Sequence, residues 1–555
     1  MADVSKLRLG NTSYDIKDDN ARRYLVMINE EPVSATKMVV ETGEDEDSVE
    51  LAYQEDLDSV EQKVDWFVTP EMFGAVGDGI TDDTFIIQNI INTYDYVLFS
   101  NTYLITGLTI TNRSGLVMKG ANGVFKLTTA CNAITLSGTN SDITIDSIGV
   151  IGSGSSSIRQ IGIAMSSGNS IENLMIKYCT FDSLACGVTI NADTSGHVSN
   201  VTMIYNTVRN IKGVDPGYGY GLLIADGSDE DTNSTISYNL IDNCDRHSIY
   251  IGRGRTYRVI GNKIINHRKD VHSGVLRPAI NIGRSNNVVV SENMVEGYDG
   301  LISTLGDNNT EGYPLNDYSV RNIIITNNTL TSVGNDLHAV YIGYTDYTVD
   351  GYPQNIVVDG NTFKGFGGIT VKYGKKIVLK DNVFDGLGTY GIALNADGES
   401  DDYEIRGNRG NNMTTALCIL TNTICTGTVS IILADNLSNT NSYYCTASIT
   451  NTNVSVYGKK AGISYNPNTA YIPINDYCDV TVTGTTGATY GELSTGIPSA
   501  SYDMVTASIS SPANVIALPY VVNNNTWYIK ALNMLDMTAK KNTAIVARVL
   551  IRRLM

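Results

Sequence analysis

Residues 323–330, 356–363 and 377–384 read IIITNNTL, IVVDGNTF and IVLKDNVF. In each copy, apolar residues alternate with residues of other types. An asparagine then stands two residues before the last apolar residue. The pattern recurs from about residue 200, with gaps of 21 to 35 residues between successive asparagines. The asparagines of the repeat are Asn206, Asn239, Asn262, Asn293, Asn328, Asn361, Asn382, Asn408 and Asn436.

The repeat predicts short β-strands that stack on copies of themselves. A second apolar segment, such as SIYI, AINI or AVYI, follows each copy. Strands this short cannot bury a sheet alone, but stacked copies form one continuous core. Asparagine tolerates the left-handed conformation and suits a sharp corner, where its side chains could also form a ladder. The smallest gaps match one turn of a three-sheet coil, so the sequence predicts an all-β, parallel β-helix with loops on its outside.

Composition and charge limit the function classes. The 555 residues include 52 Gly and 33 Tyr, only 17% are charged, and the net charge is −19. A many-turned all-β protein fits this profile, and binding to nucleic acid does not. Residues 41–65 hold eleven Asp or Glu and one Lys.

Cysteine usage and the N-terminus indicate where the protein is made. Its eight cysteines form no CxxC or metal-ligand spacing, which favours buried thiols over disulfides and predicts neither metal nor cofactor. We expect synthesis in the host cytoplasm without a signal peptide. Membrane insertion is not expected, because no apolar run approaches spanning length.

Residues 77–91, GDGITDDTFIIQNII, combine three carboxylates with an apolar run. An acid/base or metal site is one interpretation. The favoured one is an N-terminal cap, with Thr81 or Asp82 as the helix N-cap and Asp82 and Asp83 in the first turn. Phe85 and the isoleucines are then expected to face the open end of the first coil.

Two segments resemble phage proteins. TPEMFGAVGDGITDDTFIIQNII, which begins at Thr69, resembles the start of the pectate-lyase-like superfamily in the form carried by bacteriophage tailspikes. This resemblance covers about 68–460 and implies a right-handed parallel β-helix. It does not imply one reaction, since the superfamily includes lyases, hydrolases, esterases and pure binders. LRLGNTSYDIKDDNARR, near the N-terminus, resembles the opening of phage tail-fibre proteins.

The sequence divides into three predicted parts. Residues 1–67 would form a virion-attachment segment and a short helical stem, whose Tyr53, Leu57, Val60, Val64 and Phe67 follow heptad spacing. A charged linker is the alternative for that stem. Residues 68–460 would form the β-helix, and 461–555 a C-terminal β domain for trimerisation or glycan binding. The expected partners are two further copies of the chain, a phage tail, baseplate or collar protein bound through residues 1–50, and a host surface glycan.

Positive charge gathers between Arg246 and Arg284. These 39 residues hold nine Lys or Arg, three of the five histidines and a single acid, Asp270. Aligning the second strands of the repeat puts one position of each at Asp226, Arg253, Arg284 and Tyr344, with Arg253 and Arg284 on consecutive coils. Two stacked guanidinium groups need an anion between them, so this face predicts an anionic ligand. A salt-bridge ladder or a contact between subunits is the alternative.

Two reactions fit the basic segment. A uronate lyase needs a cation for the carboxylate and a base for the α-proton, whereas a glycoside hydrolase needs two carboxyl groups at a set distance. Binding without turnover, as in an adhesin or a structural tail appendage, is the third possibility. The candidate catalytic residues are His247, Tyr250, Asp226 and Asp245. The candidate ligand-binding residues are Arg253, Arg284, His267, Arg268, Lys269, His272, Arg277, Tyr341 and Tyr344.

Overall fold

The computed structural model describes residues 67–555 with gaps, and only four strands before them. Side chains are described only between 67 and 436. The gaps after residue 67 are 166, 193–194, 215–216, 229, 268–277, 298–299, 306–319, 334–337, 344–352, 373, 389, 396–400, 414–416, 422–428, 435, 439–444, 449–453, 460–461, 465–477, 486–491, 499–501, 512–514, 523–525, 534–543 and 554–555.

The N-terminal unit contributes an antiparallel sheet in the order β2-β1-β3-β4. Its strands are β1 (Val4–Leu9), β2 (Thr12–Asp15), β3 (Val39–Thr42) and β4 (Val49–Glu50). The heptad positions Tyr53 to Val64 lie outside the described residues. In the part of the chain that the structure describes, no helix is long and apolar enough to cross a membrane.

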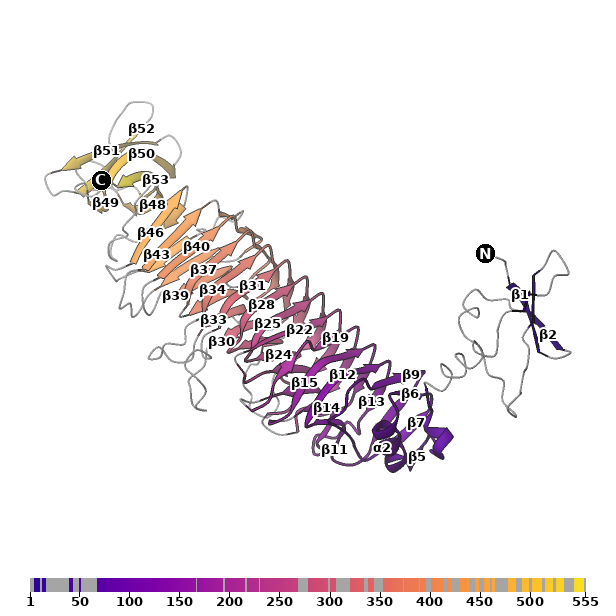
Figure 1. The fold of residues 1–555 in the computed structure, drawn as a ribbon. Coiled ribbons are helices and arrows are strands. Elements are labelled where there is room, and N and C mark those ends of the chain that lie inside the picture. Colours follow the sequence, from indigo (N-terminus) through magenta and orange to yellow (C-terminus); the bar gives the residue numbers. More distant parts are fainter. Residues whose placement is uncertain are drawn as a thin grey trace. The chain divides into compact units, whose positions relative to one another are not determined.

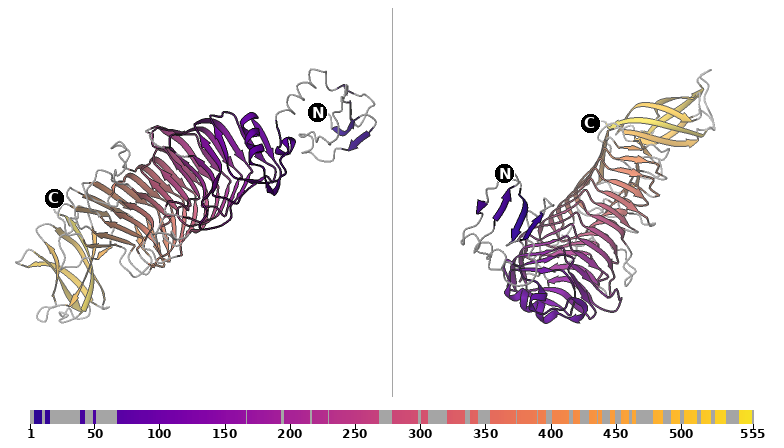
Figure 2. Two further views of the ribbon diagram at one scale, coloured as in Figure 1. Left: turned by 90° about the horizontal axis from the view of Figure 1, so that it is seen from below. Right: turned by 90° about the vertical axis from the view of Figure 1, so that its right-hand side faces the viewer.

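Three parallel sheets, here called I, II and III, form the body of the fold, and their strands stack coil upon coil (Figures 1 and 2). Sheet I contains β5 (Asp78–Asp82), β7 (Thr102–Ile105), β10 (Val124–Leu127), β13 (Gly149–Ile151), β16 (Thr180–Asp182), β20 (Thr207–Ile211), β23 (Leu240–Cys244), β26 (Lys263–His267), β29 (Met294–Gly297), β32 (Thr329–Ser332), β35 (Thr362–Gly365), β38 (Val383–Asp385), β41 (Arg409–Asn411) and β44 (Leu437–Ser438).

Sheet II follows sheet I in every coil. It contains β8 (Leu108–Thr111), β11 (Cys131–Ser137), β14 (Gln160–Met165), β17 (Cys186–Asn191), β21 (Leu222–Ala225), β24 (Ile249–Gly252), β27 (Ile280–Gly283), β30 (Ile302–Leu305), β33 (His338–Gly343), β36 (Gly368–Lys372), β39 (Ile392–Asn395), β42 (Cys418–Thr421), β45 (Cys445–Ser448), β47 (Gly462–Ser464) and β48 (Cys478–Thr485).

Sheet III opens the next coil. It contains β6 (Tyr96–Phe99), β9 (Val117–Gly120), β12 (Thr139–Asp146), β15 (Ser170–Lys177), β19 (Thr202–Ile204), β22 (Asp231–Ser237), β25 (Arg255–Ile260), β28 (Asn286–Ser291), β31 (Arg321–Thr326), β34 (Gln354–Asp359), β37 (Lys375–Lys380), β40 (Asp401–Arg406), β43 (Val429–Ala434) and β46 (Val454–Lys459), with β18 (Val198–Ser199) pairing β15. The predicted parallel β-helix is confirmed.

The interior of each coil is apolar. In the coil of β28, β29 and β30, the side chains of Val288, Val290, Val295 and Ile302 are fully buried. Alternate residues on each strand face this core and the others face outward, as the period of two in the repeat predicts. Side chains that carry chemistry therefore lie on the outer faces and at the corners.

The corner between sheets III and I is the repeated element that the sequence shows. From β12 to β41 it is two residues long, and its first residue takes a positive φ. Asparagine was expected to take that conformation, but the residue before it does, as Glu292 and Gly360 illustrate. The asparagine is the second corner residue, and its side chain points inward and is buried.

The buried asparagines form a hydrogen-bonded ladder, as the sequence predicts. Asn293 donates from its backbone N–H and its Nδ2 to Oδ1 of Asn328, both at 2.9 Å. Asn328 does the same to Asn361. Each Nδ2 also donates to a carbonyl of sheet III, such as that of Val259 for Asn293. The amide groups are thus satisfied without water, and successive coils are held in register.

The N-terminal cap is structural, with two corrections. Helix α2 (Thr84–Thr93) begins later than expected, and Phe85 is 77% exposed instead of covering the coil. Ile87, Ile90 and Ile91 are buried as predicted. The short helix η2 (Pro70–Phe73) precedes this region.

The acidic residues of the cap bind backbone groups. The carboxylate of the buried Asp83 accepts hydrogen bonds from the N–H groups of Val76 at 2.8 Å and Gly77 at 3.0 Å. Asp82 accepts from the N–H of Thr84 at 2.9 Å, and Asp78 accepts from the N–H of Thr81 at 2.7 Å. These contacts favour the cap over an acid/base site.

Parallel pairing continues to β48, beyond the predicted end at residue 460. There the pairing becomes antiparallel, with β48 and β50 (Tyr502–Ser511) on either side of β53 (Ala544–Arg553). A separate three-stranded sheet contains β49 (Glu492–Pro498), β51 (Val515–Val522) and β52 (Thr526–Asn533).

Removing one rung of the ladder should be costly. Asn328→Ala leaves the N–H and Nδ2 of Asn293 buried without their acceptor, which we expect to lower the free energy of unfolding by about 3 kcal/mol. Thr331→Ala, on the outer side of β32, is the matched control and should change it little. Thermal denaturation compares the two variants, and equal melting temperatures would contradict the structural role of the ladder.

The two adjacent aspartates of the cap should differ. Asp83→Ala exposes two backbone donors without an acceptor and should lower the free energy of unfolding by about 1–3 kcal/mol. Asp82→Ala removes a contact at the exposed helix start, so its loss should be smaller. Denaturant titration ranks the two variants, and a larger loss for Asp82→Ala would refute this assignment.

Candidate functional site

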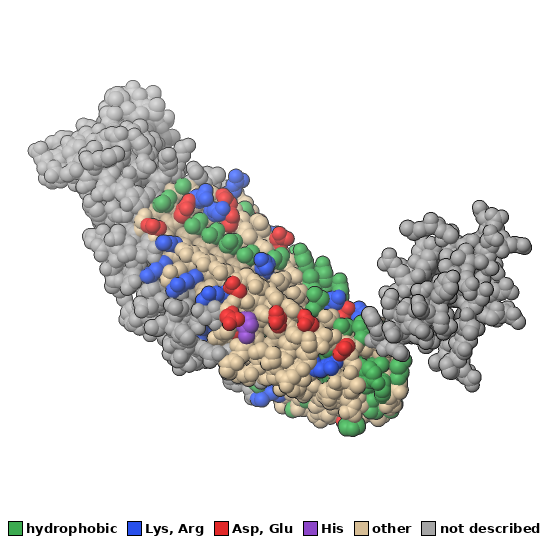
Figure 3. Space-filling model, viewed as in Figure 1, with side chains coloured by type: hydrophobic (Ala, Val, Ile, Leu, Met, Phe, Trp, Pro, Cys, Tyr) green, Lys and Arg blue, Asp and Glu red, His purple; other side chains and the backbone are tan. Residues whose placement is uncertain are grey.

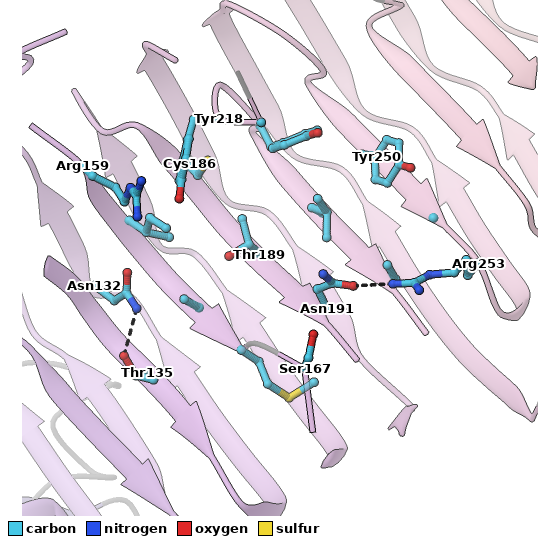
Figure 4. A pocket seen from close by; sticks show the side chains of 18 of the residues that line it. Asn132, Thr135, Arg159, Ser167, Cys186, Thr189, Asn191, Tyr218, Tyr250 and Arg253 are labelled. Atoms are coloured by element: carbon cyan, nitrogen blue, oxygen red, sulfur yellow. Dashed lines mark hydrogen bonds between the residues drawn. The ribbon is translucent and has the colours of Figure 1, made fainter. Parts of the chain in front are cut away.

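A cavity of about 710 Å³ lies on the outer face of sheet II (Figure 4). Its floor is formed by strands from β11 to β24, and its far end reaches Arg284, after β27. At about 4.8 Å per coil, these six coils span about 24 Å along the stack. The described residues that line it are Asn132, Thr135, Arg159, Ile161, Ala164, Met165, Ser167, Cys186, Thr189, Asn191, Gly217, Tyr218, Tyr220, Leu223, Ala225, Tyr250, Gly252, Arg253 and Arg284.

The walls come from the corners on either side of sheet II. Arg159, Tyr218 and Tyr220 precede or begin strands of the sheet, at the corner with sheet I. Arg253 and Arg284 directly follow β24 and β27, at the corner with sheet III. Three arginines and three tyrosines thus line the cavity, and none of its described lining residues is Asp or Glu.

Arg253 and Arg284 occupy equivalent positions on consecutive coils, as predicted, because Gly252 pairs with Gly283. The direction of the Arg253 side chain was not predicted. Its Nη2 donates to Oδ1 of Asn191 at 2.9 Å, so the guanidinium extends two coils towards the N-terminus (Figure 4). The side-chain amide of Asn191 on β17 therefore orients Arg253. The two arginines were expected to stack on each other with an anion between them, and Arg253 does not form such a stack.

The backbone at Arg253 is also fixed. Its φ is +67°, and its carbonyl accepts a hydrogen bond of 2.7 Å from the hydroxyl of Tyr257. Tyr257 is buried, and burial raises the pKa of its phenol. The hydroxyl therefore stays protonated and remains a donor at neutral pH.

Aromatic rings cluster at the edge of the cavity. Tyr220 lies 5.7 Å from His247 and 5.6 Å from Tyr250, measured between ring centroids, and His247 lies 5.4 Å from Tyr250. His247 is 3% exposed, and its Nδ1 is 2.7 Å from the carbonyl oxygen of Pro278. Because a carbonyl only accepts, Nδ1 must carry the proton. His247 therefore supports the two tyrosines from behind, and Tyr250 lines the cavity.

Gly252 lets the ring of Tyr250 lie flat on the sheet. A Cβ on Gly252 would lie 2.3 Å from Cε1 of Tyr250. The same arrangement recurs at Gly343, where a Cβ would lie 2.6 Å from Cε1 of Tyr341. The Tyr-x-Gly spacing in IYIG and VYIG thus has a steric reason.

Cys186 lines the cavity but is not a nucleophile. Burial raises the pKa of its thiol to about 11, so the thiol is neutral at pH 7. Among the described side chains, Cys131, Cys179, Cys186, Cys244 and Cys418 are all free thiols. This agrees with the expectation of unpaired cysteines.

Asp226 does not face the cavity. It follows β21 at the position equivalent to Arg253, as predicted, but its side chain is fully buried. Its Oδ2 lies 2.8 Å from Nδ1 of His197, and its Oδ1 accepts from the N–H of Ser228 at 2.9 Å. Asp226 therefore holds the turn into sheet III, and its predicted position at a catalytic face is wrong.

The other predicted residues are spread. Asp245 is buried near the corner between sheets I and II, and His267 is buried with its Nδ1 3.2 Å from the hydroxyl of Ser248. Tyr341 lies three coils beyond Tyr250 in the same outward row, outside the cavity lining. Five candidates fall outside the described residues: Arg268, Lys269, His272, Arg277 and Tyr344.

Sequence reasoning missed Arg159 and Asn191. The guanidinium carbon of Arg159 lies 4.5 Å from the ring centroid of Tyr218, a cation–π contact at the end of the cavity opposite Arg253 (Figure 4). Arg159 is a single basic residue in a serine-rich stretch of the sequence, and Asn191 is one of many asparagines. Nothing in the sequence marks either residue.

Comparison with known proteins places the fold among phage tailspikes. A mutant tailspike protein of E. coli bacteriophage HK620 has a TM-score of 0.52 at 13% identity, covering 89% of this chain and 95% of that one. The tailspike protein gp49 of Pseudomonas phage LKA1 has a TM-score of 0.50 at 12% identity, covering 88% and 99%. A mutant HK620 tailspike in complex with a pentasaccharide has a TM-score of 0.51 at 12% identity, covering 89% and 95%. The chain therefore has the right-handed parallel β-helix fold of these proteins.

No family model matches the sequence. One curated protein, a capsule-specific depolymerase of Klebsiella phage K64-1, is 62% identical over 37 residues. That match covers 6% of this chain and only 5% of the depolymerase.

Two glycines next to Tyr250 give a matched pair of variants. Gly252→Ala drives a Cβ into the Tyr250 ring and should lower the free energy of unfolding by about 1–3 kcal/mol. At Gly283 the nearest atom to an added Cβ is Oη of Tyr250 at 3.5 Å, an ordinary contact, so Gly283→Ala should be tolerated. Thermal denaturation and a crystal structure of each variant test this, and an unmoved Tyr250 ring in stable Gly252→Ala would refute it.

Proposed function

We propose that this chain is a phage tailspike, a receptor-binding protein that holds an anionic surface polysaccharide of its host bacterium and depolymerises it. The observation that carries the proposal is the lining of the cavity on sheet II. Arg159, Arg253 and Arg284 line it together with three tyrosines, within a chain of net charge −19. The tailspike fold and the short match to a capsule depolymerase support the same class of ligand.

The shape of the cavity suits a segment of a polymer. It extends over six coils, from Asn132 on β11 to Arg284 after β27, so several sugar residues fit along it. Tyrosine rings offer flat apolar faces to pyranose rings, and their hydroxyls offer hydrogen bonds. Guanidinium groups match the planar carboxylate of a uronic acid with two parallel hydrogen bonds.

Elimination is the reaction that this lining favours. Arg253 neutralises the uronate carboxylate and makes the proton on C5 more acidic, while Arg284, on the next coil, adds positive charge to the same cavity. Tyr250, acting as the phenolate, takes that proton, the C–H electrons form the C4–C5 double bond, and the C4–O4 bond breaks. The phenol of Tyr250 formed in this step then gives the proton to O4 of the departing chain, which regenerates the phenolate. His247, which was also a candidate for proton transfer, supports the Tyr250 ring from behind instead.

Hydrolysis requires a pair of carboxyl groups facing the substrate. The two acidic candidates, Asp226 and Asp245, are buried and are not among the described residues of the cavity lining. The elimination mechanism therefore has the more direct support.

The proposal includes assembly as a homotrimer, attached to a tail, baseplate or collar protein of the virion through residues 1–50. The heptad positions and the tail-fibre-like N-terminus motivate this part of the proposal. Sedimentation equilibrium at micromolar concentration should give three times the mass of one chain. A monomer would contradict it.

Charge reversal in the cavity should abolish binding. Arg253→Glu with Arg284→Glu removes two charge-assisted contacts and should weaken polysaccharide binding by about 100-fold or more. Arg258→Glu is the matched control, because Arg258 is exposed on sheet III in the same coil as Arg253. Adsorption to cells, or binding on an array of purified bacterial capsular polysaccharides, measures the effect. Wild-type binding by the double variant would place the site elsewhere.

Tyr250→Phe separates turnover from binding. The variant keeps the ring but loses the proton-transferring oxygen, so turnover should fall by about 10²- to 10⁴-fold while binding is retained. Ultraviolet absorbance of the unsaturated uronate product follows the elimination. Reducing ends without that absorbance would mean hydrolysis, and binding without any shortening of the polymer would mean an adhesin.

A further inference from the structure

A ladder of three tyrosines stands on the corner between sheets III and I, away from the cavity. Tyr178, Tyr205 and Tyr238 occupy the first corner position on three consecutive coils. Their ring centroids are 5.3 Å and 5.4 Å apart, with interplanar angles of 7° and 18°. The three side chains remain 55%, 47% and 48% exposed. The ladder is therefore a solvent-facing surface and does not belong to the core.

The backbone at these tyrosines is strained. Their φ angles are +54°, +56° and +54°, a conformation that bulky residues rarely adopt. Other coils fill the same corner position with residues that adopt this conformation more readily, such as Gly261, Asn327 and Gly360. Three strained positions gain only two ring contacts in return. Strain of this kind, on an exposed surface, points to a role outside folding.

A hollow of about 330 Å³ lies beside the ladder on the outer face of sheet III. Met175 and Thr202 line this hollow. Met175 stands three residues before Tyr178 in the chain, and Thr202 stands three residues before Tyr205. On the other side of the hollow, amides form a second ladder. Nδ2 of Asn173 donates to Oδ1 of Asp142 at 2.8 Å, and Nδ2 of Asn200 donates to Oδ1 of Asn173 at 3.0 Å.

This surface differs in charge from the cavity on sheet II. Lys177, next to Tyr178 in the chain, has its Nζ 3.5 Å from Oδ2 of Asp146, which also pairs with Lys119 at 2.6 Å. Met175 and Leu240, beside the tyrosines, are exposed apolar side chains. Figure 3 shows apolar side chains gathered along this edge of the β-helix, over strands of sheet III. The surface offers aromatic rings, hydroxyls and amides, and no Lys or Arg is among the described residues that line its hollow. The carboxylate in that lining, Asp142, accepts hydrogen bonds from Asn173 and Ser114.

We propose that the tyrosine ladder and the adjoining hollow form a second carbohydrate-binding site, which takes uncharged sugar residues of the polysaccharide. This inference rests on the proposed function, because it assigns the second site to the same polymer. Aromatic rings with neighbouring amides and hydroxyls are the groups that bind neutral pyranoses, while the arginine-lined cavity takes the anionic residues. A polymer held on two faces of the β-helix is bound more tightly than by either site alone.

The strain of the tyrosines provides the test. A triple variant replaces the three strained tyrosines by asparagine: Tyr178→Asn, Tyr205→Asn and Tyr238→Asn. Asparagine already occupies the equivalent corner position at Asn327. This triple variant should fold as well as the wild type, with an unchanged or higher melting temperature. On an array of purified bacterial capsular polysaccharides, its affinity for the polysaccharide that the wild type binds should fall at least tenfold.

Two controls separate this inference from the proposed function. Glu292→Asn changes the same corner position on a later coil and should leave binding unchanged. The triple variant should still cleave short oligosaccharides of that polysaccharide at the wild-type rate, since the cavity is intact, whereas Arg253→Glu with Arg284→Glu should not. A wild type that binds no polysaccharide would refute the proposed function, and with it this site.

Two outcomes overturn the second site alone. The first is a triple variant that binds the polysaccharide as tightly as the wild type. The second is a triple variant with a markedly lower melting temperature or an altered oligomeric state, because the ladder would then serve folding or contact between copies of the chain.

Discussion

The asparagine ladder is the constraint on which the rest of the molecule depends. Each buried amide accepts two hydrogen bonds from the coil before it and donates to the coil after it, as Asn328 does between Asn293 and Asn361. A shift of one residue in any strand would break these bonds and turn the apolar side chains outward. The ladder therefore fixes the register of sheets III and I in every coil that contains it, while apolar burial supplies most of the free energy of folding.

A fixed corner on one side has a consequence for the others. The corner between sheets III and I stays at two residues from β12 to β41, so insertions fall on the two corners that flank sheet II. Those corners supply Arg159, Tyr218 and Arg253, which line the cavity together with Asn191 at the end of β17. The ladder thus keeps one corner constant in length, while the loops at the other two corners can vary in length. The side chains that line the cavity come mainly from these variable corners.

The fold could be predicted because its signal is repeated and chemically specific. A carboxamide accepts and donates in the pattern that Asn328 shows, and the short side chain of asparagine places it at the corner, so the repeat is visible in the sequence even where the loops differ. Arg253 and Arg284 could be predicted to lie on one face because the register of sheet II aligns them, and Tyr250 because it belongs to a group of tyrosines in the same strands. Arg159 and Asn191 were missed, because they reach the cavity through spatial contacts to which local sequence gives no pattern.

Errors in the predicted site arose at the corners. Asp226 and Arg253 occupy equivalent positions on adjacent coils, yet Asp226 turns inward to His197 while Arg253 extends along the sheet to Asn191. Register fixes where a residue stands on the backbone. At a corner, neighbouring side chains decide which way it points, and the alternation of a strand no longer applies.

The two-residue corner also affects how such a molecule can change over longer times. Because one coil ends as the next begins, at an amide that makes the same pair of contacts to its two neighbours in rung after rung, a whole coil is a self-contained unit of length. Recombination that joins two related genes within these corners would preserve the ladder whatever strands and loops each parent contributed. The Asn corners are therefore natural crossover points, at which one set of outer strands and loops could be exchanged for another while the stack itself remains continuous.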